Sequence, residues 1–229
     1  MPAKSVKAAA KLPHIHDGVF FNRPAVLRRG RHNLKPEQVA SAQRERILAA
    51  VTELLAAKGY KSFGAVEIAR HAGVSLQAFY ACFKNKDDCV FAGYDRFIKI
   101  LLKRMAAVKI ADVKRGAIVH SLVGAYLETL QSDLVVARAY QVEIDALGAP
   151  ARERRRKSLT LFASHIKAAM EQPAPRKKQS PELPWSSYLG VVYAVRQLAS
   201  DALDAEPEPD LNLLREDVEI WIADLYRQR

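Results

Sequence analysis

The sequence predicts an all-α protein with an amino-terminal three-helix head containing a helix-turn-helix, followed by a helical bundle. Three observations favour this class. Long stretches carry apolar residues at the spacing of one helix face. No credible stretch of four or more residues alternates between apolar and polar, as a half-buried strand would. Residues 65–88 contain two short helical patterns separated by a glycine, which is typical of a helix-turn-helix.

The first long helix is expected from about Pro36 or Ser41 to Lys58, and Gly59 ends it. Apolar side chains share one face of this helix, and charged side chains share the other. The apolar set is Ile47, Val51, Leu54 and Leu55, and the charged set is Arg44, Glu45 and Glu53.

The helix-turn-helix follows from the turn at Gly73. Glycine permits the left-handed backbone of a tight turn, and Ser75 can cap the helix that follows. That helix, roughly Leu76 to Phe83, places Phe79 and Phe83 on one apolar face. The opposite face is therefore available to read a DNA groove.

A further helix begins near Asn85 and Lys86, with carboxylates in its first turn. The free N–H groups at its start, together with a lysine, suit a phosphate. Apolar residues continue it at helical spacing: Val90, Tyr94, Phe97, Leu101 and Met105.

Several short motifs match one family at its own spacing. They are Gly59-Tyr60, Ile68-Ala69, Ala72-Gly73-Val74-Ser75, Phe79-Tyr80, Phe83 and Asn85-Lys86-Asp87. Together they resemble the DNA-binding segment of the TetR family of transcriptional regulators, over about residues 44–94 without a gap. Two positions depart from the family pattern: Gly64 replaces a hydroxyl cap, and Cys82 replaces a phosphate donor.

The resemblance implies which side chains meet double-stranded DNA. Base edges are expected near the first turn of the recognition helix, and phosphates around it. The implied base-reading residues are Ser75, Leu76 and Gln77. The remaining implied contacts are Ala78, Tyr80, Lys84 and Lys86, with Arg44 beside a phosphate. The spacing of Leu76 to Phe79 and Phe83 also fits burial.

Residues 1–40 are expected to form a basic, flexible arm, because they hold four prolines and no long helical period. Within it, residues 27–32 resemble the basic arm of some actinobacterial-type TetR regulators. Arg28, Arg29 and Arg31 are candidates for an adjacent minor groove, where arginine inserts readily. A solvated tail that only aids solubility is an equally weighted alternative.

We therefore expect three segments: the arm at 1–40, the DNA-binding domain at 41–88, and an effector-binding and dimerisation domain at 89–229. Four helical stretches follow Met105, near 119–130, 133–147, 150–170 and 185–203, and a last one covers 211–226. The resemblance implies that the last two helices pair with their copies in a homodimer on a pseudo-palindromic operator. The alternative is that they only complete the monomer core.

A small, largely apolar effector is the second partner that the resemblance implies. Aromatic and long apolar side chains are the candidates to line its cavity: Phe97, Met105, Tyr126, Tyr140, Phe162 and Tyr188. Such residues at helical spacing mark a packed core more often than a pocket. Arg138, Glu143 and His165 are candidates to orient the ligand or, equally, surface groups.

Charge and composition agree with a DNA-binding head. The net charge is +11, and residues 1–90 hold 15 Lys and Arg against 7 Asp and Glu. Such a patch attracts phosphate backbones or an anionic membrane, and the helix-turn-helix favours DNA. No apolar run reaches the roughly 20 residues of a membrane span, and residues 1–12 lack a secretion signal. We expect a cytoplasmic protein without membrane contact.

The sequence gives no support for an enzyme, a cofactor or a metal site. The two cysteines and six histidines lack metal-site spacing, and no catalytic motif occurs. The leading hypothesis is a dimeric repressor released by its ligand. The alternatives are a weakly specific architectural DNA-binding protein without an effector, and an enzyme or carrier that retains the head.

Overall fold

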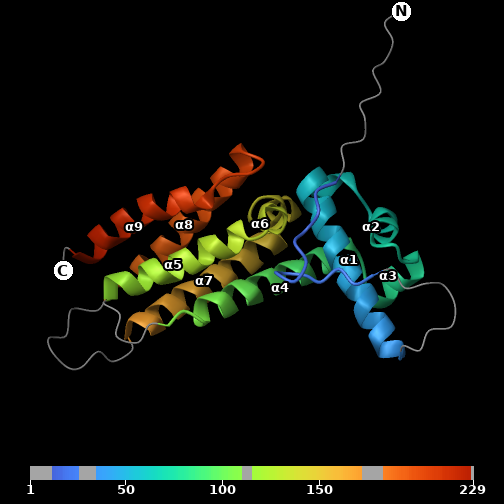
Figure 1. Ribbon diagram of the computed structural model, residues 1–229, viewed down its shortest axis with the longest axis horizontal. Coiled ribbons are helices and arrows are strands. Elements are labelled where there is room, and N and C mark those ends of the chain that lie inside the picture. The colour runs from blue at the N-terminus through green and yellow to red at the C-terminus, as the bar shows by residue number, and fades with distance from the viewer. Residues whose placement is uncertain (1–11, 26–34, 110–114, 172–182, 228–229) are drawn as a thin grey trace, which may run out of the picture.

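The computed structural model describes residues 12–25, 35–109, 115–171 and 183–227. Within these ranges the regular structure is helical, apart from one isolated bridge between Asp17 and Phe21. Figure 1 shows an elongated molecule with the head at one end and a bundle of long helices at the other. The predicted all-α class is confirmed.

The head consists of α1 (Pro36–Lys58), the short 3₁₀ turn η1 (Tyr60–Ser62), α2 (Ala65–Ala72) and α3 (Leu76–Cys82). Proline at the first position suits the start of α1, because its missing N–H would have no partner there. Both α2 and α3 pack against α1. The head is therefore built around one long helix.

The body contains six long or medium helices and one 3₁₀ segment in the described part of the chain. They are α4 (Lys86–Ala106), α5 (Arg115–Gln131), α6 (Leu134–Gln141), η2 (Glu143–Leu147), α7 (Ala149–Glu171), α8 (Trp185–Ala205) and α9 (Leu211–Arg227). The last helix packs mainly along α5, and α8 packs on α7 and α6. Figure 1 shows α4 running from the head into the bundle.

One predicted helix is divided. The stretch 133–147 was expected to be continuous, but α6 ends at Gln141 and η2 follows. The Gln141 carbonyl accepts hydrogen bonds from Arg196 Nη2 at 2.6 Å and Ser200 Oγ at 3.2 Å, both on α8. Those contacts use the carbonyl that a continuing helix would need four residues later.

The middle of α1 is buried on all sides. Ten consecutive residues, Arg46–Leu55, are buried. The expectation that Glu53 faces solvent is wrong, because its side chain is completely buried. A buried carboxylate must be compensated by hydrogen bonds or charge, and the compensating groups come from the segment before α1.

The expectation of a flexible arm over residues 1–40 is wrong for two parts of it. Residues 36–40 belong to α1, and residues 12–25, which we call the strap, pack on the core. Ile15, Phe20 and Phe21 are buried, and Gly18, with φ of 82°, makes the turn between them. Figure 1 shows the strap lying across α1 beside α4. Three buried apolar side chains hold it there without helical periodicity.

A close helix contact joins α4 to α6. A Cβ atom at Gly93 would lie 1.9 Å from the hydroxyl oxygen of Tyr140. That hydroxyl is also 2.8 Å from Thr52 Oγ1 on α1. The absence of a side chain at Gly93 therefore allows three helices to meet at one tyrosine.

We expect Gly93→Ala to lower the free energy of unfolding by about 1–3 kcal/mol through overpacking. Tyr140→Phe removes the nearest clashing atom, so the double variant should lose less than the sum of the two single variants. Urea unfolding of all four proteins measures this coupling. Strict additivity would contradict the contact.

Candidate functional site

The turn of the helix-turn-helix has the predicted geometry. Gly73 is left-handed, with φ of 63° and ψ of 39°, and the N–H of Val74 donates to Ala69 O at 3.0 Å. Ser75 Oγ accepts the N–H of Ala78 at 3.1 Å and caps α3. Arg46 on α1 donates to the last carbonyl of α2, Ala72 O, at 2.7 Å. Both ends of the turn are thus fixed.

The recognition helix α3 has one buried and one exposed face. Phe79 and Phe83 are buried at 0% and 2% exposure, and their rings lie 6.0 Å apart. Leu76 and Tyr80 are exposed at 39% and 54%, so Leu76 belongs to the outer surface. The predicted residues that reach solvent on and beside α3 are Ser75, Leu76, Gln77, Tyr80 and Lys84, with Ala78 half-buried.

Arg44 lies at the far end of α3. Its guanidinium donates to Cys82 O at 3.1 Å and stands 4.3 Å from the centre of the Phe83 ring. The residue remains exposed, so it supports α3 while its other N–H groups face outward. Burial raises the pKa of the Cys82 thiol, opposed by the charge of Arg44. Cys82 is therefore a neutral thiol and a poor phosphate donor.

Lys86 is placed differently from the expectation of a free phosphate contact. Its ammonium donates to Tyr60 O at 2.8 Å and Phe63 O at 3.0 Å, and it lies 3.8 Å from the centre of the Tyr60 ring. Burial lowers its pKa, opposed by Asp87. Two of its three N–H donors hold α4 against the turn between α1 and α2, which leaves one for a phosphate.

The other positions singled out in the sequence are Gly64, Asn85 and the three arginines of the arm. Gly64 caps α2 without a side-chain hydrogen bond, as its lack of a hydroxyl requires. Asn85 Oδ1 accepts the N–H of Asp88 at 2.8 Å and caps α4 as predicted. Arg28, Arg29 and Arg31 lie outside the described residues, so their contact with DNA stays a prediction.

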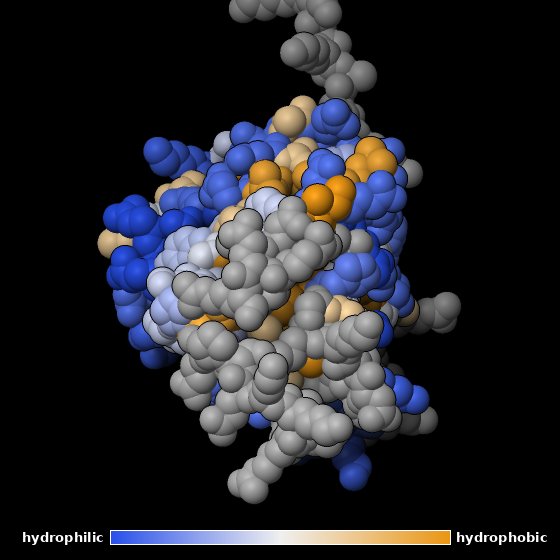
Figure 2. All heavy atoms as spheres, turned by 90° about the vertical axis from the view of Figure 1, so that its left-hand side faces the viewer, coloured by the Kyte–Doolittle hydropathy of each residue, from blue (hydrophilic) through white to orange (hydrophobic). Residues whose placement is uncertain are grey.

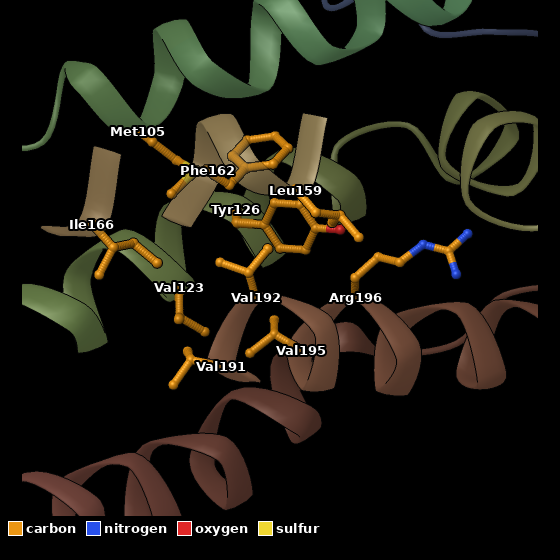
Figure 3. A pocket seen from close by; sticks show the side chains of 10 residues that line it. All are labelled: Met105, Val123, Tyr126, Leu159, Phe162, Ile166, Val191, Val192, Val195 and Arg196. Atoms are coloured by element: carbon orange, nitrogen blue, oxygen red, sulfur yellow. The ribbon is translucent and has the colours of Figure 1, made fainter. Parts of the chain in front are cut away.

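A small cavity lies between α4, α5, α7 and α8 (Figure 3). Its volume is about 30 Å³, which is room for one or two water molecules. Its lining is apolar except for Tyr126 and Arg196. The lining residues are Met105, Val123, Tyr126, Leu159, Phe162, Ile166, Val191, Val192, Val195 and Arg196.

Three of the six predicted ligand residues line this cavity: Met105, Tyr126 and Phe162. Phe97 and Tyr140 do not, because they form an aromatic cluster with the strap, and their ring centres lie 5.4 Å apart. Tyr188 is buried outside the lining. These three residues therefore do not line this cavity, and their contact with a ligand stays a prediction.

Sequence reasoning missed Arg196 as a cavity residue. It lies at 9% exposure, donates to Gln141 O, and stands 3.5 Å from Asp145 Oδ2. The sequence signal that could have identified it is its charge, because Arg196 lies on the same, otherwise apolar face of α8 as Val192. Figure 3 shows the Tyr126 hydroxyl at the Arg196 end of the cavity and Ile166 at the other. Of the earlier orienting candidates, Arg138, Glu143 and His165 do not line it.

Comparisons with known proteins concern the head on one hand and the fold of most of the chain on the other. Residues 47–92 match the family model described as "Bacterial regulatory proteins, tetR family". The match covers the second half of α1, all of α2 and α3, and the start of α4. The head is therefore similar to the helix-turn-helix DNA-binding segment of that family. No helix among the described residues is long and apolar enough to cross a membrane, and no potential metal cluster occurs within the same residues.

Solved structures of similar fold cover most of the chain. The fatty acid degradation regulator FadR from Bacillus halodurans aligns with 84% of this chain and 97% of its own, at 18% identity and a TM-score of 0.66. FadR from Bacillus subtilis, in complex with stearoyl-CoA, aligns with 78% of this chain and 96% of its own, at 17% identity and a TM-score of 0.61. NalD, the secondary repressor of a multidrug efflux pump in Pseudomonas aeruginosa, aligns with 80% of this chain and 96% of its own, at 19% identity and a TM-score of 0.59.

We expect Gln77→Ala to cost about 1–3 kcal/mol on a duplex selected by the wild-type protein, and much less on unselected DNA, because Gln77 is exposed on the first turn of α3. Lys84→Ala should weaken both duplexes alike and flatten the salt slope by about one unit. The control is Lys99→Ala, an exposed lysine on the body. Fluorescence anisotropy at several salt concentrations measures these effects. Equal losses on both duplexes for Gln77→Ala would contradict base reading.

Proposed function

We propose that this protein is a regulator of the TetR type, a homodimeric repressor that leaves its pseudo-palindromic operator when a small, largely apolar ligand binds the body. The observation that carries the proposal is that α4 connects the two sites. Lys86 at its first turn holds the turn of the head, and Met105 at its last turn lines the cavity. Displacement of α4 by a ligand therefore acts on the position of the recognition helix.

The outer faces of α8 and α9 support the homodimer. Leu213 and Ile220, seven residues apart on α9, are exposed at 69% and 66%, and Tyr193 on α8 at 41%. A Cβ atom at Gly190 would meet no atom within 4 Å, so a second helix has room to approach. Figure 2 looks onto the end of the bundle, where visible apolar residues are interspersed with hydrophilic ones. Exposed apolar side chains on paired helices favour a protein interface.

The cavity lining supports an amphipathic ligand. Its apolar walls suit a hydrocarbon body, and Tyr126 and Arg196 suit one polar end. Ligand cavities usually measure about 300–1,000 Å³, so binding must move α8 or α7 outward. A protein of similar fold holds stearoyl-CoA, which makes fatty acids and their CoA thioesters the first compounds to test.

A charge at the proposed interface should produce monomers. We expect Leu213→Glu and Ile220→Glu to halve the mass measured by light scattering and to weaken operator binding, since half-site pairing needs two heads. Leu161→Glu is the matched control, because Leu161 is 54% exposed on α7. A wild-type monomer at micromolar concentration would contradict the homodimer.

Thermal-shift measurements with fatty acids and acyl-CoA thioesters of graded chain length test the ligand. We expect the shift to grow with chain length, because each buried CH₂ contributes about 0.8 kcal/mol. Val195→Phe, which fills the cavity, should abolish the shift, whereas Leu161→Phe on the surface should keep it. The same compounds should weaken operator binding, and DNA should weaken the compounds by the same factor. If none of these compounds stabilises the protein, the result favours the alternative of an architectural DNA-binding protein without an effector.

A further inference from the structure

The strap contacts elements of both the head and the body. It reaches α1 and, through Glu53, α2 of the head. It also reaches the start of α6 and the aromatic cluster of α4 and α6 in the body. The contacts lie up to 117 residues apart in the sequence. The strap thus runs across the junction between the DNA-binding head and the ligand-binding body.

Glu53 on α1 binds the strap near both of its ends. Its Oε1 accepts the N–H of Ile15 at 3.1 Å and lies 3.1 Å from His14 Nδ1. Its Oε2 accepts from Arg23 Nη2 at 2.7 Å and lies 2.6 Å from His71 Nε2 on α2. Burial alone raises the Glu53 pKa, but these hydrogen bonds and the Arg23 charge lower it below its ordinary value. One ionised carboxylate therefore holds the strap and α2 to α1.

Asp133 in the body binds the strap at His16. Its Oδ2 accepts the N–H of His16 at 2.7 Å, and its Oδ1 accepts the N–H of Val136 and caps α6. His16 Nδ1 lies 2.7 Å from Ser132 O. The residue that starts α6 is thus also a residue that holds the strap.

Two phenylalanine rings of the strap pack on aromatic rings of the body. The Phe20 ring lies 5.3 Å from Phe97 on α4, and the Phe21 ring 6.4 Å from Tyr140 on α6. Both phenylalanines are 1% exposed. Their burial stabilises the strap in one position, because a displaced strap would expose both rings to water.

We propose that the strap fixes the orientation of the head on the body, and that Glu53 and Arg23 are positioning residues for operator binding. Without the strap, the head contacts the body through α4, through α1 against α6, and through η1 against η2. The strap adds further attachments at Glu53, at Asp133 and at the two phenylalanines. This inference rests on the proposed dimeric regulator, because head orientation matters only where two heads must match two half-sites.

Arg23→Ala tests the proposal, with Arg154→Ala as its control. Each removes a partly exposed arginine from a carboxylate 2.7 Å away, but the Arg154–Asp95 pair lies wholly within the body. We measure affinity for a duplex selected by the full-length wild-type protein and for an unselected duplex. Circular dichroism at the same temperature confirms that each variant is folded.

We expect Arg23→Ala to weaken the selected duplex by about five- to tenfold. The unselected duplex should change less than twofold, because it needs charge and not matched spacing. Arg23→Lys should restore part of the loss, and Glu53→Gln should repeat it. Arg154→Ala should change neither duplex. Equal losses on both duplexes, or none, would overturn the positioning role, since the first indicates direct phosphate attraction and the second a purely structural strap.

Hydrogen exchange separates this inference from the proposed function. If the wild-type protein selects no duplex, the regulator proposal fails, and the exchange data then decide on the strap. We expect Arg23→Ala, unlike Arg154→Ala, to speed amide exchange both in α2 and in the first turn of α6, because the strap connects them. Faster exchange in neither helix would overturn the strap's role.

Discussion

The middle of α1 must be covered on every side, and the rest of the molecule is arranged to do so. A helix that buries ten consecutive residues cannot rest on a single neighbour. Three polar residues within that run each contact a different part of the molecule. Arg46 bonds to α2 of the head, Thr52 contacts Tyr140 of the body, and Glu53 holds the strap. Each buried polar group needs a partner, so each fixes one neighbour in place.

The head could be predicted from the sequence because its determinants are local. Gly73 needs only its own backbone freedom, and Ser75 caps the helix that starts at the next residue by accepting an N–H three residues away. Phe79 and Phe83 mark a face by their spacing. The partners of Lys86 could not be predicted in this way. The two carbonyls that it bonds lie 23 and 26 residues earlier, and only the folded head brings them together.

The strap and seven of the ten residues that line the cavity were missed for a related reason. The apolar residues of the strap, Ile15, Phe20 and Phe21, have no period, and their partners are remote in the sequence. Phe97 and Tyr140 were correctly expected to be buried, but spacing along a helix does not say which neighbour covers a residue. Their neighbours are strap rings, whereas Tyr126 and Phe162, 5.9 Å apart, face the cavity. A carboxylate at Glu53 within an apolar run was the one signal available.

The junction around α1 also limits how a ligand can act. The 21 residues of α4 span about 30 Å at 1.5 Å per residue, so its two ends respond to displacement as parts of one rigid rod. The head end is held through Lys86, and its middle contacts Tyr140 at Gly93. Because Tyr140 also contacts Thr52, a shift of α4 at Met105 cannot leave α1 unaffected. Phe20 of the strap packs on Phe97 of α4, so the strap resists displacement of α4 at that point. In the proposed mechanism, a ligand must supply enough differential binding energy to move α4 against the strap. Phe20 and Phe21 would then help to determine how strongly the ligand and DNA oppose each other.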